Sequence, residues 1–118
     1  MQVQGRCHCG SIRYEASVDP ERTAICHCTD CQRLTGSAYR VSVPADEGSF
    51  RLTAGEPSFC PRCGSPLYTY DADHPKVYGL RVGCIDGREA LVPRRQKWCR
   101  SALAWTESLA GMEKRATE

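Results

Sequence analysis

The spacing of the cysteines is the feature that most restricts what this chain can fold into. Nine of its 118 residues are cysteines, and seven of them stand in three short motifs: Cys7-His8-Cys9, Cys26-His27-Cys28-Thr29-Asp30-Cys31 and Cys60-Pro61-Arg62-Cys63. A disulfide scaffold would have an even number of cysteines and an export signal. The count here is odd, the first residues do not resemble a signal peptide, and cysteines one residue apart cannot form an unstrained disulfide. We therefore expect an intracellular, cytoplasmic zinc protein.

Two of the motifs together supply four thiolates for one closed zinc site. A gap of one or two residues in a tight turn lets both sulfurs of a pair reach the same Zn²⁺ at ~2.3 Å. Gly10 and Gly64 follow the two pairs directly and can adopt positive φ, which turns backbone N–H groups toward the sulfurs. We predict a structural zinc ion bound by Cys7, Cys9, Cys60 and Cys63.

The third motif, Cys26, Cys28 and Cys31, offers three sulfurs within six residues. Three protein ligands and an open position are typical of a catalytic zinc ion, whose open position can bind and deprotonate a thiol or water. The alternative is a closed second site completed by one further side chain, for which the candidates are His8, His27, Cys84 and Cys99. We favour the open site, because His8 and His27 lie between ligands and should point away from them. Cys84 and Cys99 are interpreted as small buried residues.

Short alternating segments predict a mainly β fold within one domain spanning residues 1–118. The strand-like segments are residues 11–16, 23–25, 39–43, 50–53, 67–70, 77–82 and 94–99. A helical turn is expected from Thr29, with Thr29 as its cap and Gly36 at its end. Residues 102–114 could be irregular or helical, Trp98 and Trp105 are expected in the core or at its rim, and His74 in an exposed polar turn.

Charge and hydropathy argue against two classes of partner. The formal charge is +2, but seven thiolates with two Zn²⁺ ions would add three negative charges, so a dedicated nucleic-acid surface is not expected. No apolar stretch approaches the ~20 residues that span a bilayer. We predict no membrane association.

Taken together, these motifs resemble the glutathione-dependent formaldehyde-activating enzymes, a family that also includes centromere protein V-like domains. The resemblance covers nearly the whole chain, and its landmarks are residues 5–14, 26–38, 59–67, 83–86 and Trp105. It implies folded antiparallel sheets like those of methionine-R-sulfoxide reductases, and two zinc ions per chain. It also implies that Cys7, Cys9, Cys60 and Cys63 are structural ligands, and that Cys26, Cys28 and Cys31 hold the catalytic ion.

The resemblance implies a zinc-dependent carbon–sulfur lyase or synthase. The family reaction joins glutathione and formaldehyde into S-(hydroxymethyl)glutathione, which agrees with an open zinc site that activates a thiol. The expected partner is thus a small thiol such as glutathione, with Arg33 and Arg40 as candidates to bind its carboxylates. Two alternatives stay open at this point: a non-catalytic zinc module that binds protein or nucleic acid, and a sulfoxide-reductase-type redox enzyme.

Overall fold

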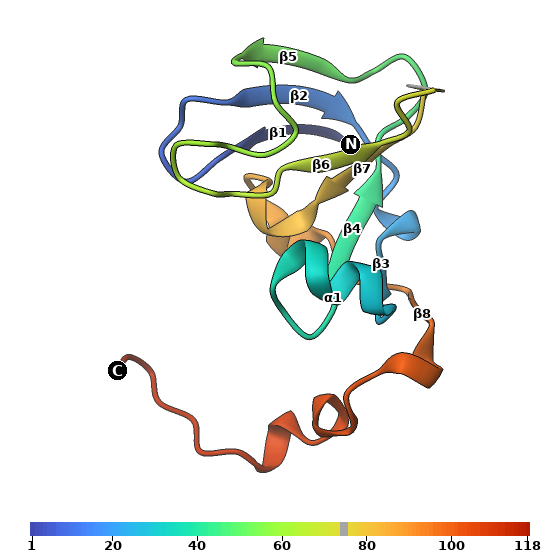
Figure 1. The fold of residues 1–118 in the computed structure, drawn as a ribbon, viewed down its shortest axis with the longest axis vertical. Coiled ribbons are helices and arrows are strands. Elements are labelled where there is room, and N and C mark those ends of the chain that lie inside the picture. The colour runs from blue at the N-terminus through green and yellow to red at the C-terminus, as the bar shows by residue number, and fades with distance from the viewer. Residues whose placement is uncertain (74–75) are drawn as a thin grey trace.

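Two mainly antiparallel β-sheets pack face to face in the computed structural model, which describes residues 1–73 and 76–118 (Figure 1). The smaller sheet has the order β1 (Gln2–Arg6), β2 (Arg13–Ser17), β5 (Arg51–Ala54). The larger sheet has the order β6 (Tyr68–Tyr70), β7 (Tyr78–Arg81), β4 (Arg40–Pro44), β3 (Ala24–Cys26), β8 (Arg95–Lys97). Only the β3–β8 pairing is parallel among these described strand pairs. The mainly β prediction is confirmed.

The strands that the alternating pattern predicted are all present within two residues of their expected bounds; β8, for example, ends at Lys97 rather than Cys99. Strand β1 was not predicted, because its sequence Gln-Val-Gln-Gly-Arg has a single large apolar residue. Val3 nevertheless lies in the core, 4% exposed. Pairing with β2 over five residues, from Gln2 opposite Ser17 to Arg6 opposite Arg13, supplies the backbone hydrogen bonds that the weak pattern does not reveal.

The core lies between the two sheets and is built from alternate residues of each strand. Tyr14 and Ala16 of β2 face Val43 of β4 and Leu80 of β7, and all four are at most 1% exposed. Leu67 and Ile85 fill the same layer and are fully buried. Each such aliphatic side chain contributes roughly 1.5–3 kcal/mol when it leaves water. Because these alternate residues point into the core, the residues between them lie on the outer face of the larger sheet, away from the smaller sheet, and can be polar.

An aromatic cluster closes one end of this core. Phe50 and Tyr78 stack with ring centroids 4.2 Å apart, and the Tyr14 ring lies 5.3 Å from that of Phe50. Tyr14 also crosses directly over Gly5 of β1, where any Cβ atom would lie 2.1 Å from the Tyr14 Cζ atom. Position 5 is restricted to glycine by this close approach.

Helix α1 (Thr29–Thr35) follows β3 and packs against β4. Its N-cap is Cys28, whose Sγ accepts a hydrogen bond from the Cys31 N–H, so the prediction of Thr29 as the cap was wrong by one residue. A thiolate-type acceptor can take the place of the usual hydroxyl or carboxylate at this position. The helix ends at Gly36 with φ of 62°, as predicted.

Six 3₁₀ turns complete the secondary structure of the described residues. They are Pro20–Arg22, Val82–Cys84, Arg88–Ala90, Cys99–Ser101, Ala104–Glu107 and Leu109–Gly111. No helix among the described residues is long and apolar enough to cross a membrane. The predicted exposed turn at His74 lies outside the described residues.

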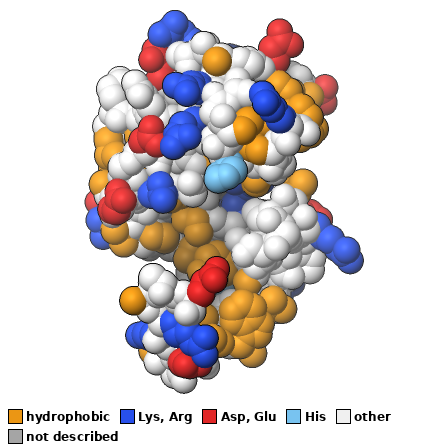
Figure 2. All heavy atoms as spheres, turned by 90° about the vertical axis from the view of Figure 1, so that its left-hand side faces the viewer, with side chains coloured by type: hydrophobic (Ala, Val, Ile, Leu, Met, Phe, Trp, Pro, Cys, Tyr) orange, Lys and Arg blue, Asp and Glu red, His pale blue; other side chains and the backbone are white. Residues whose placement is uncertain are grey.

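The C-terminal segment runs away from the two sheets at the bottom of Figure 1. Its hydrophobic side chains stay accessible, as the orange groups on the lowest part of the molecule in Figure 2 show. Trp98 is 52% and Trp105 50% exposed, so neither belongs to the core. Trp98 has φ of 58° and its ring is covered on one side by Arg100, 4.9 Å away.

Candidate metal centres and thiol site

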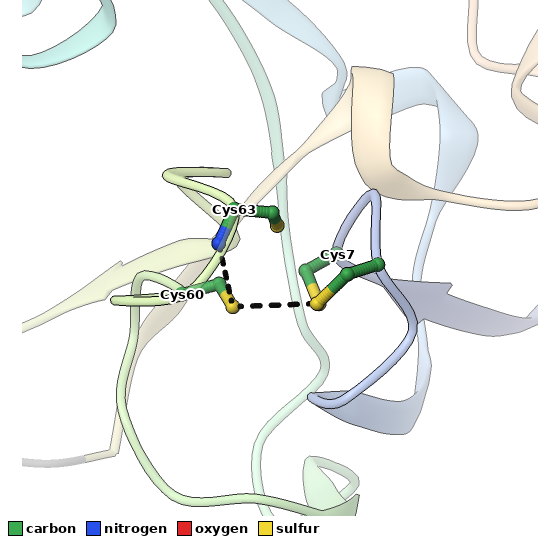
Figure 3. Close-up of side chains that lie close together, drawn as sticks. Cys7, Cys60 and Cys63 are labelled. Atoms are coloured by element: carbon green, nitrogen blue, oxygen red, sulfur yellow. Dashed lines mark hydrogen bonds between the residues drawn. The ribbon is translucent and has the colours of Figure 1, made fainter.

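Four cysteines from two distant segments converge beside the smaller sheet. Cys7 and Cys9 come from the loop between β1 and β2, and Cys60 and Cys63 from the loop between β5 and β6. Figure 3 shows Cys7 facing Cys60 and Cys63 across this cluster. Their four Sγ atoms all lie within 4.8 Å of one another. The sequence-predicted set is therefore brought together completely.

The sulfur separations fit a tetrahedral metal ion. Cys7 Sγ lies 3.6 Å from Cys9 Sγ, which lies 3.7 Å from Cys60 Sγ. Sulfurs placed ~2.3 Å from a tetrahedral Zn²⁺ are about 3.8 Å apart, whereas a disulfide brings them to about 2.05 Å. All nine cysteines are free of disulfides. The spacing of this donor set is that of a metal site.

Backbone N–H groups and two serine hydroxyls surround these sulfurs. Ile12 N–H donates to Cys7 Sγ at 3.3 Å, and Cys63 N–H donates to Cys60 Sγ at 3.4 Å. Ser11 Oγ lies 3.1 Å from Cys9 Sγ and 3.4 Å from Cys60 Sγ. Sequence reasoning missed Ser11, although its position two residues after a ligand is the signal that could have identified it. These contacts favour thiolates over thiols.

The same contacts change the acidity of three thiols. The Ser65 hydroxyl, 3.3 Å from Cys63 Sγ, is the main cause that lowers the pKa of Cys63 to about 5. Burial opposes ionisation of Cys7, but the Ile12 N–H and the neighbouring hydroxyl and thiols outweigh it and lower its pKa to about 7. Gly10 and Gly64 adopt φ of 81° and 82°, as predicted. The Ser11 hydroxyl and N–H favour ionisation of Cys9, but burial and the neighbouring Cys7 and Cys60 outweigh them and raise its pKa. A bound cation would favour the thiolate form of all four.

The second cluster lies at the end of β3 and the start of α1. The Sγ atoms of Cys26, Cys28 and Cys31 also lie within 4.8 Å of one another. The Cys31 N–H lowers the pKa of Cys28, whereas burial raises the pKa of Cys31 to about 12. Cys28 is therefore more easily ionised than Cys31, and a bound cation would favour ionisation of the buried Cys31 thiol.

Within the described part of the chain, no fourth His, Cys, Asp or Glu joins the three-cysteine cluster. The His27 ring turns away from it, with Nε2 2.8 Å from Gln96 Oε1. Cys84 is half-buried, and its Sγ donates to the Pro66 carbonyl at 3.4 Å. Cys99 is exposed, so its interpretation as a buried residue was wrong. The candidates for a closing ligand are engaged elsewhere or lie outside the cluster.

Two arginines lie near this cluster on the outer face of the larger sheet. Arg81 is only 6% exposed, and its Nε and Nη1 have no hydrogen-bond partner among residues 1–73 and 76–118. Burial lowers the pKa of Arg81, nearby Arg40 lowers it further, and the Cys31 and Cys84 thiols counteract both effects. The sequence analysis missed Arg81, because an arginine in an alternating strand is usually solvent-exposed. Its buried charge complements the negative charge of thiolates at the cluster.

The architecture defines a small two-sheet protein with one complete four-cysteine cluster and one three-cysteine cluster. The sequence profile of the family "Glutathione-dependent formaldehyde-activating enzyme" matches residues 2–101. The chain belongs to this family, and the predicted resemblance is confirmed.

Two curated relatives have sequences similar to this chain, and one solved structure has a similar fold. A Halomonas elongata protein named "Putative glutathione-dependent formaldehyde-activating enzyme" is 25% identical over 114 residues, covering 80% of this chain and 73% of the relative. An uncharacterized lyase of Schizosaccharomyces pombe is 23% identical over 100 residues, covering 76% and 73%. A Rhodobacter sphaeroides crystal structure has the same fold, with a TM-score of 0.61 at 21% identity, covering 80% of this chain and 99% of the other.

Proposed function

We propose that this protein is a zinc-dependent carbon–sulfur lyase or synthase that acts on glutathione-type thiol adducts. The observation that carries the proposal is the contrast between the two clusters: among residues 1–73 and 76–118, four sulfurs converge at one and three at the other. Family membership supports this reaction class. Formation of S-(hydroxymethyl)glutathione from glutathione and formaldehyde is the specific reaction we propose.

In this proposal, Cys7, Cys9, Cys60 and Cys63 hold a structural Zn²⁺, which fits the four-sulfur spacing. Cys26, Cys28 and Cys31 hold a second Zn²⁺ with three protein ligands. When bound there, the ion supplies Lewis acidity that keeps a substrate thiol ionised at neutral pH. Two ions per chain are expected.

The reaction forms one bond and moves one proton. The thiolate sulfur attacks the carbonyl carbon of the aldehyde, so a carbon–sulfur bond forms and the carbonyl π electrons move to oxygen. That oxygen then takes the proton that the thiol lost. Half-buried Cys28 lies at the accessible side of the cluster, whereas Cys26 and Cys31 are buried, so the thiol is expected to approach beside Cys28.

Cys28→Ser provides the sharpest test, because serine retains a cap for α1 while it removes a soft metal ligand. We expect a folded protein with about one zinc ion per chain and loss of formaldehyde-dependent glutathione consumption. Cys99→Ser is the matched control, since Cys99 is exposed and outside both clusters. It should retain two zinc ions and full turnover. Full turnover in Cys28→Ser would overturn the proposal.

The competing interpretation as a non-catalytic module requires a closed second site. Cobalt substitution distinguishes the two, because thiolate-to-cobalt absorption reports the ligand set. A spectral change on adding glutathione supports an open position, and an unchanged spectrum supports the closed site. Zinc loss in Cys84→Ala or Cys99→Ala would identify a closing ligand.

A further inference from the structure

The outer face of the larger sheet holds a cavity of about 500 Å³. Its walls come from β3, β4, β6, β7 and β8, and they include Arg22, Arg40, Asp71, Arg95 and Lys97. Val43, Tyr68 and Leu80 neighbour lining residues on β4, β6 and β7, and all three belong to the core. Because successive strand residues point to opposite faces, the cavity lies on the side away from the smaller sheet. A volume of this size accommodates a small organic molecule.

This cavity begins beside the three-cysteine cluster. In the sheet register, Cys26 is directly opposite Arg40 on one side and Lys97 on the other. Directly opposite residues project from the same face, with Cβ atoms about 5 Å apart. Two cationic side chains of the cavity thus flank the first cysteine of the cluster. The cavity and the cluster are adjacent parts of one surface.

The lining is strongly cationic. Four of its side chains are Arg or Lys and one is Asp71. None of the four cations forms an ion pair among residues 1–73 and 76–118, where the described pairs use Arg51, Arg94 and Arg115. Arg40 Nε is buried without a hydrogen-bond partner among the same residues. A concave surface with several unpaired cations attracts anions and gives their oxygens charge-assisted hydrogen bonds.

The register also sets the length of a suitable ligand. The lining continues along β4 from Arg40 through Ser42 to Pro44. The four steps between these five residues, at about 3.4 Å each, correspond to about 14 Å. A ligand whose sulfur lies at the cysteine cluster can therefore extend over a tripeptide-sized distance along the sheet, which a simple two-carbon thiol cannot.

We propose that this cavity binds the carboxylates of the thiol substrate, so that the enzyme selects an extended, anionic thiol. The inference rests on the proposed function, because it places the substrate sulfur at Cys26, Cys28 and Cys31. Arg40, Arg95 and Lys97 hold the carboxylates, and the single carboxylate of Asp71 suits an ammonium group of the same ligand. Arg40, named from the sequence, lies in the site, whereas Arg33 does not line the cavity.

The first test measures binding without chemistry. Isothermal titration of the zinc-loaded protein with S-methylglutathione, which has the carboxylates but no free thiol, should give saturable binding. The double variant Arg95→Gln, Lys97→Gln should weaken it by at least about tenfold, since a hydrogen bond to a charged group contributes about 1.5–3 kcal/mol. Both side chains are exposed, so the variant should fold.

Two controls separate charge from shape. Arg94→Gln removes an adjacent cation that pairs with Glu21 and lies outside the cavity lining, and it should bind S-methylglutathione like the wild type. The diethyl ester of S-methylglutathione lacks the carboxylates, so wild type and double variant should bind it equally weakly. Equal binding of S-methylglutathione by wild type and double variant would overturn the inference. Tighter binding of inorganic phosphate than of S-methylglutathione would also overturn it, by assigning the cavity to a phosphate ligand.

Kinetics distinguish failure of this inference from failure of the proposed function. The double variant should raise the KM for glutathione by at least about tenfold, and added salt should reduce this difference. An active wild type whose KM is unchanged in the double variant contradicts the cavity assignment alone. Charge-dependent binding of S-methylglutathione by a protein that shows no turnover contradicts the reaction alone.

Discussion

Tyr14→Phe should stabilise this protein, because the phenol hydroxyl of Tyr14 is buried without a partner. Tyr14 is 1% exposed, and its hydroxyl has no hydrogen-bond partner among residues 1–73 and 76–118. Burial of a hydroxyl without a hydrogen bond costs about 1–3 kcal/mol in protein mutational data. Phenylalanine keeps the ring contacts with Phe50 and Tyr68 and removes that cost. We expect the free energy of unfolding to rise by about 1–3 kcal/mol at pH 7.

The same side chain gives a pH dependence with a defined sign. Burial, followed by nearby Cys84, Asp86 and Tyr68, raises the pKa of Tyr14 well above its ordinary value. The unfolded chain ionises at about pH 10, so the contribution is complete below pH 10 and is lost as the pH rises toward the folded pKa. Linkage gives RT ln(1 + 10), or about 1.4 kcal/mol, lost by pH 11. Tyr14→Phe should lose about 1.4 kcal/mol less than the wild type between pH 8 and pH 11.

Urea unfolding followed by circular dichroism at pH 7, 8 and 11 measures both effects, on zinc-loaded protein throughout. Subtracting the unfolding free energy of the wild type from that of Tyr14→Phe at each pH cancels the contributions of the other titrating groups. Equal slopes of unfolding free energy against urea concentration would show that the two unfolded states are comparable. A Tyr14→Phe protein that is less stable at pH 7 would refute the reasoning, since the hydroxyl would then have a bonding partner. A pH dependence equal to that of the wild type would refute the assignment of the raised pKa.

Four further perturbations test other parts of the structure. Gly5→Ala should destabilise the fold by more than about 2 kcal/mol or prevent folding, because its Cβ would overlap Tyr14, and urea unfolding measures this. Chelation of the ion proposed at the four-cysteine cluster should unfold the protein. Structural zinc contributes roughly 10 kcal/mol or more, whereas the total stability of such a domain is about 5–15 kcal/mol. Circular dichroism measures the unfolding, and metal analysis measures the zinc that is removed. Glu15→Gln, which breaks an exposed pair with Arg51, should change the free energy of unfolding by less than about 1 kcal/mol. Truncation after Ala102 should change it by less than about 1 kcal/mol, because the removed residues are mostly exposed; a large loss would show that this segment packs on the sheets.

Cysteine spacing within each motif and alternation within each strand predicted much of this structure because both are local patterns. The seven cysteines were grouped correctly, and Val43 and Leu80 were placed by alternation in strands that the structure contains. Strand β1 was not predictable from one apolar residue, because its pairing with β2 is what stabilises it. The cap at Cys28 was missed because a cysteine was assigned only a ligand role.

The cavity beside the three-cysteine cluster could not be predicted from any single segment. Its lining comes from five strands, and the β3–β8 pairing that brings Lys97 beside Cys26 joins residues far apart in sequence. Arg81 and Arg95 are both arginines in strands, yet one is buried and the other exposed. Only the tertiary arrangement separates these two environments.

The two clusters also differ in how soon they can assemble during folding. Cys26, Cys28 and Cys31 lie within six residues, whereas Cys9 and Cys60 are 51 residues apart. Closing a loop of that length costs about 3.5 kcal/mol in chain entropy by the (3/2)RT ln n estimate, before its additive constant. The short motif can gather its sulfurs while the chain is still unfolded or partly synthesised. The four-cysteine cluster joins the β1–β2 loop to the segment after β5, so we expect all four sulfurs to come together only when the smaller sheet has formed.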